Sequence, residues 1–147
     1  MQPHKNNVSR MLKELRNPPS REFPLYSAQV NAGFPSPADD YIETQLDLNE
    51  HLIKHPAATF FVRATGDSMI HAGIHSGDIL IVDRSLESGD RKIVIAAINR
   101  ELTVKRIGKQ NGKLYLLPEN PFFEPIEITD DMEFEIWGVV TRVIHSL

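Results

Sequence analysis

Two side chains of the 147-residue sequence could together carry out nucleophilic chemistry: Ser68 and Lys105. A serine hydroxyl becomes a nucleophile only beside a base, and an uncharged lysine amine is such a base. Lysine has an ordinary pKa of about 10.4 and is almost fully charged at neutral pH. Burial in an apolar pocket lowers that pKa by up to ~3–5 units. Lys105 stands among mostly apolar neighbours in residues 101–107, which is compatible with such burial.

Each of the two residues also has an ordinary explanation. Ser68 follows Gly66 and Asp67 directly after a predicted strand, where the glycine lets the chain turn sharply and where serine is common. Lys105 could be a surface lysine whose aliphatic stem covers apolar neighbours. The two features are weak separately, so their joint interpretation depends on the rest of the chain.

The histidines and acidic residues suggest no competing site. None of the six histidines stands in a context that points to Ser68. His71 and His75 have the i, i+4 spacing of a helical metal site, but Gly73 between them disfavours a helix, so we expect exposed turn residues. The acidic residues within 130–135 are interpreted as a solvent-facing loop rather than paired catalytic carboxylates. Since cysteine is absent, no thiolate zinc site is possible, and we predict neither a metal nor a cofactor.

The composition indicates one domain without a membrane span. The chain is 41% hydrophobic, enough to build a sizeable core at this length. Its longest purely apolar run, residues 93–98, is far shorter than the ~20 residues of a membrane helix. The first residues lack the apolar region of a secretory signal. We therefore expect a cytoplasmic protein.

Charge is unevenly distributed along the chain. Residues 1–22 have a net charge of +3, which leaves −7 for residues 23–147 out of a total of −4. An acidic body is a poor partner for a phosphate backbone, because nucleic-acid affinity comes largely from clustered lysine and arginine. We therefore expect no direct sequence-specific DNA binding and interpret the basic residues as part of a solvated arm.

The N-terminal part predicts an extended arm followed by one short helix. Residues 1–40 contain six of the ten prolines, which favours an extended and mobile arm. A short amphipathic helix within residues 8–15 is also possible. Residues 47–56 predict the one short helix, capped by Asp47 or Asn49 and ended by Pro56. We accordingly predict an arm over residues 1–40 and a compact domain over residues 41–147.

From residue 58 onward the pattern predicts a mostly β fold, a small barrel or sandwich of short strands. The predicted strands cover residues 59–64, 78–83, 92–98, 101–107, 113–117 and 134–144. Asn111-Gly112 indicates a type I′ hairpin, whereas Asn99-Arg100 lacks the glycine expected of such a turn. Gly138 predicts a kink in the last strand.

Several of these features together resemble the LexA/UmuD family of self-cleaving serine–lysine peptidases. The resemblance begins with a Gly-Asp-Ser-Met turn at 66–69, a lysine 37 residues after Ser68, and the strand sequence Gly-Asp-Ile-Leu-Ile-Val-Asp at 77–83. Ala32-Gly33 is similar to the family's scissile Ala/Cys-Gly dipeptide. Further similarities lie at residues 23–27, 33–38, 40–41, 46–49 and 137–140. The details are closer to the family's mutagenesis subunits than to its repressors, whose helix-turn-helix would not fit into the 22 residues before Phe23.

The resemblance implies a mostly β homodimer in which Ser68 is the nucleophile and Lys105 the general base. It implies a cut between Ala32 and Gly33, where a small side chain and a glycine let the main chain approach the hydroxyl. The backbone N–H groups of Ser68 and Asp67 would stabilise the oxyanion. In the family, cleavage is stimulated by RecA filaments on single-stranded DNA. The trimmed dimer then joins a UmuC-type polymerase for error-prone translesion synthesis in the SOS response to DNA damage.

Two other classes of protein are compatible with the same residues. One is a non-catalytic dimeric regulatory module that binds the polymerase and RecA partners while its Ser68–Lys105 pair is vestigial. The other is a relative of signal peptidases, which share serine–lysine chemistry. We disfavour the second because no membrane anchor is predicted.

Overall fold

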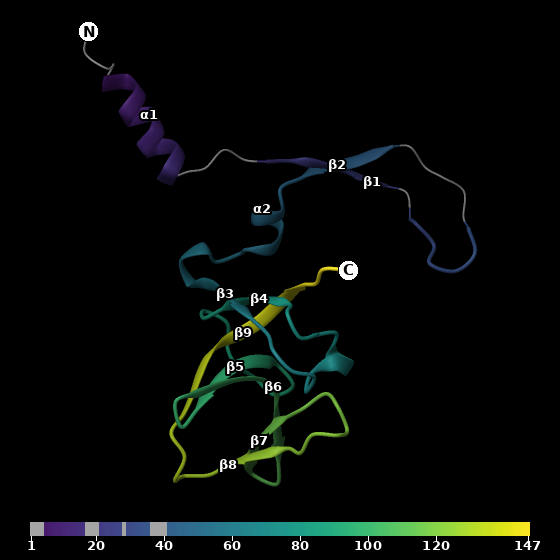
Figure 1. The fold of residues 1–147 in the computed structure, drawn as a ribbon, viewed down its shortest axis with the longest axis vertical. Helices are drawn as coiled ribbons and strands as arrows, with labels where there is room; N and C mark the ends of the chain where they lie inside the picture. Colours follow the sequence, from purple (N-terminus) through teal and green to yellow (C-terminus); the bar gives the residue numbers. More distant parts are fainter. Residues whose placement is uncertain (1–4, 17–20, 28, 36–40) are drawn as a thin grey trace. The chain divides into compact units, whose positions relative to one another are not determined.

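The computed structural model describes residues 5–16, 21–27, 29–35 and 41–147 of the chain (Figure 1). It separates into two units, Met1–Lys54 and His55–Leu147, and each unit is described by itself. The fold is mostly β, with a curled sheet in the second unit, as the sequence predicted. The division at residue 40 between arm and domain stays a prediction.

The described part of the first unit contains a helix, a two-stranded hairpin and a second, shorter helix. Helix α1 spans Lys5–Arg16, somewhat longer than the helix considered possible within residues 8–15. Strand β1 (Phe23–Tyr26) pairs antiparallel with β2 (Ile42–Leu46). Strand β1 was not predicted in this proline-rich region, but Pro24 is tolerated because, among the described residues, β1 pairs with one strand only.

Helix α2 (Leu48–Leu52) is the short helix that the sequence predicted. Asp47 caps its N-terminus, since its carboxylate accepts a hydrogen bond of 2.9 Å from the Asn49 N–H. The helix ends at Leu52 and Ile53 is already extended, so it stops earlier than the predicted boundary at Pro56. With α1, the described residues hold two α-helices where the prediction named one.

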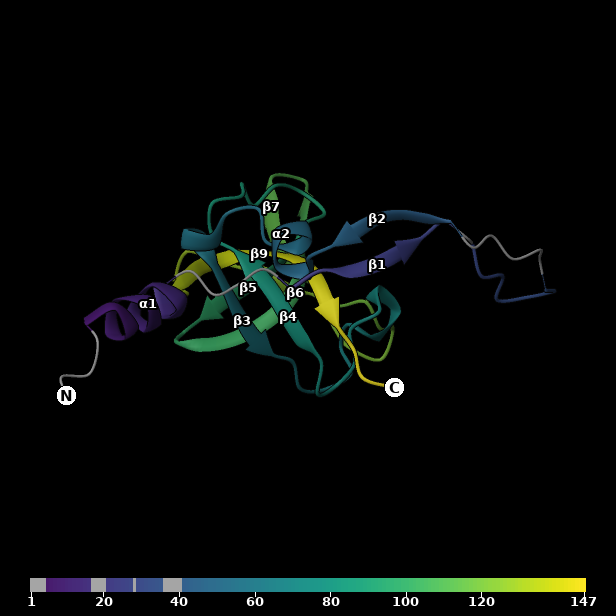
Figure 2. The same cartoon turned by 90° about the horizontal axis from the view of Figure 1, so that it is seen from above.

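Seven strands of the second unit form one curled antiparallel sheet in the order β3-β4-β9-β5-β6-β7-β8 (Figures 1 and 2). Their bounds are Thr59–Arg63 (β3), Ile79–Asp83 (β4), Ile93–Ile98 (β5), Glu101–Gln110 (β6), Lys113–Leu117 (β7), Ile126–Ile128 (β8) and Phe134–Ile144 (β9). Two short 3-10 turns, η1 (Pro56–Ala58) and η2 (Ile70–Ala72), interrupt the loops. The six strands predicted for this unit are all present, and β8 was missed.

Strand β5 is apolar throughout because both of its faces are buried. The first core cluster contains Ala64, Met69, Ile74, Leu80, Val82 and Ile95. The second core cluster contains Val94, Ala96, Ile107, Leu116 and Val139. Since side chains alternate between the two faces of a strand, Ile95 faces the first cluster while Val94 and Ala96 face the second. The sheet thus carries a packed layer on each side of β5.

Two tight hairpins join β5 to β6 and β6 to β7. Asn111 (φ 52°) and Gly112 (φ 73°) both have positive φ, as the predicted type I′ turn requires. Asn99 (φ 48°) and Arg100 (φ 68°) adopt the same pair of conformations without a glycine. Hydrogen bonds to Glu133 support this second turn: the Asn99 N–H donates to the Glu133 carbonyl at 2.8 Å, and Asn99 Oδ1 accepts from the Glu133 N–H at 3.0 Å.

Strand β9 pairs with both β4 and β5, and Gly138 permits this close approach. The register with β5 shifts beside Gly138, where the sequence predicted a kink: Ile95 pairs with Gly138, but Ala96 pairs with Ile136. A Cβ on residue 138 would lie 2.7 Å from Val82 Cγ1 of β4. A glycine at this position therefore lets three strands pack without a clash.

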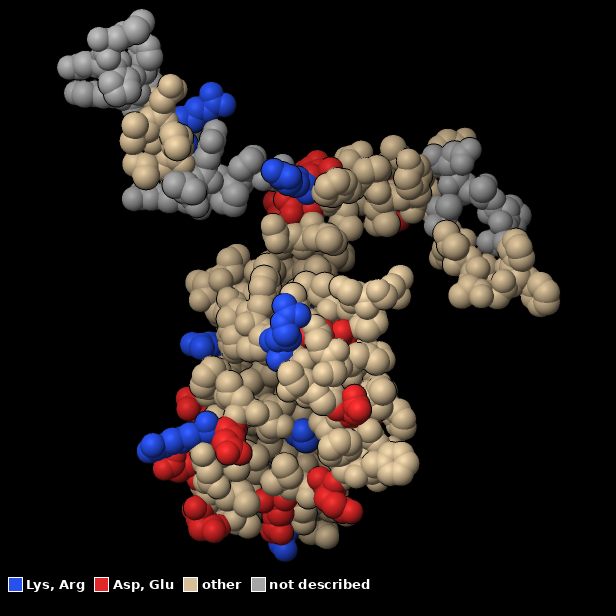
Figure 3. Space-filling view, viewed as in Figure 1, with Lys and Arg blue, Asp and Glu red and all other residues tan. Residues whose placement is uncertain are grey.

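Among the residues that the structure describes, no helix combines the length and the apolar character needed to cross a membrane. Acidic and basic side chains are interspersed over the face of the second unit that Figure 3 shows. No broad basic surface is visible on the described part of that face.

Candidate active site

Ser68 lies in the loop that follows β3, and this loop is held at several points. It turns at Gly66, whose φ of 86° is a left-handed conformation that favours glycine. The Gly66 N–H donates to Ser76 Oγ at 3.1 Å. Met69, only 1% exposed, packs into the first core cluster. The half-buried Ser68 side chain is therefore fixed at the rim of the domain.

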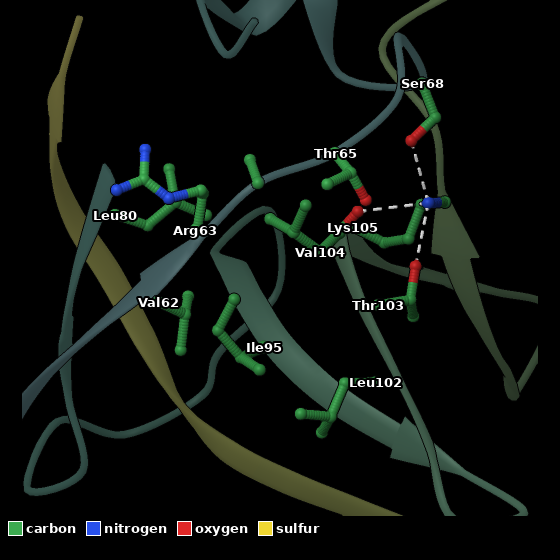
Figure 4. Close-up of a pocket in the computed structure, with 11 residues that line it drawn as sticks. Val62, Arg63, Thr65, Ser68, Leu80, Ile95, Leu102, Thr103, Val104 and Lys105 are labelled. Carbon is green, nitrogen blue, oxygen red and sulfur yellow. Dashed lines mark hydrogen bonds between the residues drawn. The ribbon is translucent and has the colours of Figure 1, made fainter. Parts of the chain in front are cut away.

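Lys105 lies in β6 with only 8% of its surface exposed. Its Nζ is 2.8 Å from Ser68 Oγ, 2.9 Å from Thr103 Oγ1 and 3.1 Å from the Val104 carbonyl oxygen (Figure 4). Thr103 can reach Nζ because residues i and i+2 of a strand face the same side. Three strands separate β3 from β6 in the sheet order, so the curl of the sheet brings the serine and the lysine together.

Burial lowers the pKa of the Lys105 amine below its ordinary value, because desolvation disfavours the charged form. No carboxylate of the described residues forms an ion pair with Nζ to oppose this effect. An uncharged amine has two hydrogens and one lone pair. The hydrogens can bond to Thr103 Oγ1 and the Val104 carbonyl, and the lone pair can accept the Ser68 O–H. This is the arrangement in which the amine can act as a general base.

A pocket of about 160 Å³ lies beside the two side chains. Four strands contribute apolar lining residues: Val62, Leu80, Ile95 and Leu102. Its polar lining residues are Arg63, Thr65, Ser68, Thr103 and Lys105 (Figure 4). Ser68 and Lys105 thus lie at the edge of a small cavity with both polar and apolar walls.

Glu119 connects the loop of Ser68 to the strand of Lys105. Its N–H donates to the Ser68 carbonyl at 2.8 Å, and its carbonyl accepts from the His71 N–H at 2.9 Å. Its carboxylate pairs with the guanidinium of Arg106, the residue after Lys105 on β6. Neither Thr103 nor Glu119 was predicted as a site residue from the sequence. The strand alternation could have identified Thr103, but no local pattern marks Glu119.

The backbone N–H groups of Asp67 and Ser68 were predicted to bind an oxyanion. Neither group donates a hydrogen bond to any other part of the described chain. The Asp67 carbonyl instead accepts from the Ile70 N–H (3.3 Å) and from Asn120 Nδ2 (3.0 Å), which restrains the peptide units beside it. Both amides thus lack an acceptor among the described residues, and their role in catalysis stays a prediction.

The predicted cleavage site, Ala32-Gly33, lies in the first unit. Both residues are exposed and belong to a bent segment within the described stretch 29–35. The Gly33 N–H donates to Asn31 Oδ1 at 2.8 Å, which closes the bend locally. Cleavage at this bond stays a prediction, because the first unit and the Ser68–Lys105 pair are described separately.

The histidines of the described chain take no part in the Ser68 site. None of their side chains hydrogen-bonds to Ser68, and the His71 side chain is exposed. His55 Nδ1 lies 2.6 Å from the buried carboxylate of Asp83. His75 is also exposed, as predicted, and it lies beside Asp78 and His145.

A compact β domain that holds a serine hydroxyl 2.8 Å from a buried lysine amine is compatible with the class of serine peptidases. The chain belongs to the Peptidase S24-like family, whose family model matches residues 24–141. Members of this family are serine peptidases. The resemblance to the LexA/UmuD family is thereby confirmed.

Three relatives show how far the similarity extends. Protein SamA of Salmonella typhimurium is 46% identical over 131 residues, which cover 89% of this chain and 91% of SamA. Protein ImpA of Escherichia coli is 48% identical over 130 residues, which cover 83% of each chain. The LexA repressor of Bordetella pertussis is 36% identical over 118 residues, which cover 80% of this chain but only 54% of the repressor.

Proposed function

We propose that this protein is a self-cleaving serine–lysine peptidase that cuts its own Ala32-Gly33 bond. The observation that carries the proposal is the 2.8 Å contact between Lys105 Nζ and Ser68 Oγ, with the amine buried and its pKa lowered. A lysine retained at such a desolvated position destabilises the fold, because burial disfavours its charged form. Activation of the neighbouring hydroxyl is the chemical purpose that this arrangement serves.

In the first half of the reaction, Lys105 Nζ takes the proton of the Ser68 hydroxyl. Ser68 Oγ attacks the carbonyl carbon of Ala32 and forms a tetrahedral intermediate. The N–H groups of Ser68 and Asp67 bind its oxyanion. The C–N bond then breaks, and Nζ returns the proton to the departing nitrogen of Gly33.

In the second half, water hydrolyses the ester between Ala32 and Ser68. Nζ accepts a proton from the attacking water, and the ester bond breaks with the proton passing back to Ser68 Oγ. The products are residues 1–32 and residues 33–147, and the site is restored. The small pocket beside Ser68 supports a scissile bond flanked by alanine and glycine rather than by bulky residues.

The family supports a role for the trimmed chain after cleavage. The similarity to SamA and ImpA over most of both chains, and to a LexA repressor over part of its length, supports a place in the SOS response to DNA damage. In this role, RecA filaments on single-stranded DNA stimulate cleavage in the cytoplasm. The homodimer of residues 33–147 then acts as the accessory subunit of a UmuC-type translesion polymerase. The chain itself reads no DNA sequence.

Intact-mass spectrometry after alkaline incubation tests the peptidase directly. We expect wild-type protein to yield a fragment that begins at Gly33, because raised pH deprotonates the amine. Ser68→Ala and Lys105→Ala should stay intact. Lys109→Ala is the matched control: Lys109 lies on the same strand but is exposed, and its variant should be cut like the wild type.

The same measurement separates this function from the non-catalytic module. A vestigial pair would leave the wild type intact at every pH, with or without RecA filaments. Cleavage at another bond would retain the chemistry but overturn the assignment of Ala32-Gly33. The dependence of the rate constant on protein concentration then distinguishes cutting within one chain from cutting between two chains.

A further inference from the structure

A second group of side chains, outside the Ser68–Lys105 site, converges where β4 begins. His75, Asp78 and His145 each present a potential ligand atom, and these atoms all lie within 4.8 Å of one another. His145 Nδ1 is 2.5 Å from Asp78 Oδ1, and His75 Nδ1 is 3.7 Å from Asp78 Oδ2. The centroids of the two imidazole rings are 4.7 Å apart. Two imidazoles thus flank one carboxylate.

The sheet register explains why residues 67 positions apart meet here. Strand β4 begins at Ile79 and β9 ends at Ile144, and these two residues are paired partners in the antiparallel ladder. Asp78 and His145 are the next residues outward and therefore lie opposite each other. Gly77, with φ 94°, lets the preceding turn bring His75 back to the same carboxylate.

The carboxylate is buried and held in place, whereas the imidazoles are accessible. Asp78 is 3% exposed, and its Oδ2 accepts the His75 N–H at 2.7 Å. Its backbone is tied to Ala64, because the Ala64 N–H donates to the Asp78 carbonyl at 2.8 Å. Arg63 Nη1 also donates to the Gly77 carbonyl at 2.9 Å, which restrains the turn further. The imidazole side chains are 46% and 43% exposed, so an ion in solution can reach them.

We propose that His75, Asp78 and His145 bind one divalent transition-metal ion of the zinc type. Imidazole nitrogen and carboxylate oxygen are suitable ligands for such ions, and three protein ligands leave a fourth position for water. With metal–ligand distances of about 2.0–2.2 Å, the ligand atoms of a tetrahedral ion lie ~3.3 Å apart. Coordination through Nδ1 uses the tautomer of the neutral imidazole that has its proton on Nε2, so the ion takes the place of the hydrogen bond between His145 Nδ1 and Asp78 Oδ1. Because His145 lies beyond the end of β9, its side chain can move by this amount without disturbing the sheet.

The proposal is independent of the peptidase function, although the two sites are linked through the chain. The turn that carries His75 and Asp78 bonds to Ala64, and Ser76 in the same turn accepts the Gly66 N–H. A bound ion would therefore join the end of β9 to the segment that leads into the Ser68 loop.

Equilibrium dialysis against Zn²⁺ tests the site with the full-length chain. A Ser68→Ala background keeps every variant intact, so the result does not depend on cleavage. We expect one saturable Zn²⁺ per chain and a melting temperature that rises with Zn²⁺ concentration. His75→Ala and His145→Ala should each weaken binding by at least ~10-fold, since loss of an outer contact alone has an effect of that size.

The matched control is His71→Ala, which removes an exposed histidine four residues before His75 and should bind Zn²⁺ like the parent chain. Far-UV circular dichroism checks that the two ligand variants remain folded, as expected for half-exposed side chains. Absence of saturable binding by the parent chain overturns the proposal. Equal binding by the parent, His75→Ala and His145→Ala overturns it as well, because the ion would then be held elsewhere.

Discussion

Thr103 Oγ1 lies 2.9 Å from Lys105 Nζ, and the two side chains are on the same face of β6. The threonine hydroxyl and the Val104 carbonyl together accept the two hydrogens of an uncharged amine. The lone pair is then directed to Ser68 Oγ at 2.8 Å. In the proposed reaction, Thr103 is therefore a positioning residue for the Lys105 amine.

Thr103→Val should slow self-cleavage while leaving the domain folded. Valine retains the shape of threonine but removes the acceptor, so the amine loses one of the contacts that orient it. Loss of a hydrogen bond to the ammonium form should also lower the Lys105 pKa further and shift the rise of the rate to lower pH. We expect a rate reduction of about 10-fold or more, measured by intact mass against pH. An unchanged rate and an unchanged pH profile would show that Thr103 has no positioning role.

The lowered pKa of Lys105 predicts a pH-dependent stability. The unfolded chain holds this proton up to about its ordinary pKa of 10.5, whereas the folded chain releases it at lower pH. Stability therefore rises with pH across the window between the lowered value and 10.5, and the contribution is lost as the pH falls through that window.

Replacement of the amine by an uncharged side chain of similar length should remove this dependence. In a Ser68→Ala background, Lys105→Met should raise the melting temperature most at pH values below the lowered pKa, and the gain should shrink as the pH approaches 10.5. Differential scanning calorimetry across this pH range measures the gain. A gain that stays constant with pH would contradict a lowered pKa.

The Arg106–Glu119 pair should affect cleavage more than stability. Each side chain is 31% exposed, and a pair of this kind contributes at most about 1 kcal/mol to the free energy of unfolding. Glu119→Gln should nevertheless slow cleavage by about 10-fold, because it loosens the link between the Ser68 loop and β6, and small misplacements of a nucleophile are costly.

A double-mutant cycle with Arg106→Met tests whether the pair acts as a unit. If it does, the double variant should be cut about as fast as either single variant. The pH at which the rate rises should stay unchanged, in contrast to Thr103→Val. Additive losses in the double variant would show that the two residues act separately.

Gly138→Ala should destabilise the second unit through a steric clash. A Cβ at this position would lie 2.7 Å from Val82 Cγ1 and 3.0 Å from the Asp83 carbonyl oxygen. Overpacking of this kind costs about 1–3 kcal/mol, measured as the free energy of unfolding in urea. Gly89→Ala is the matched control, because its added Cβ meets no atom within 4 Å and should change stability by less than about 0.5 kcal/mol. Equal stability of the two variants would contradict the close approach of β9 to β4.

Much of the fold follows from local patterns. The apolar run at 93–98 indicated a strand, and the structure explains its continuity by burial on both faces of β5. Asn111-Gly112 indicated a hairpin because both residues tolerate positive φ, and both adopt it. Strand β1 was not predicted, because Pro24 disfavours a strand unless that strand pairs on one side only, and the sequence does not show which strands pair.

The candidate site was only partly predictable. Ser68 and Lys105 were identified from their residue types and from the resemblance to the LexA/UmuD family. The backbone amides of Asp67 and Ser68 were proposed because they lie at the predicted nucleophile. Glu119 and the His75–Asp78–His145 cluster were not, because their partners come from distant segments. Which of these residues meet depends on strand order and register, and no local sequence pattern specifies either of them.

The amino-acid sequence by itself determined six of the seven strands of the second unit, the Asn111-Gly112 turn and the two residues suited to nucleophilic chemistry, because these depend on side-chain type and spacing. Tertiary structure alone decided that Lys105 is desolvated and reaches Ser68, since its low exposure requires the sheet to curl until β6 meets the end of β3. Desolvation is a property of the whole surrounding packing, and it is what makes an ordinary lysine a base.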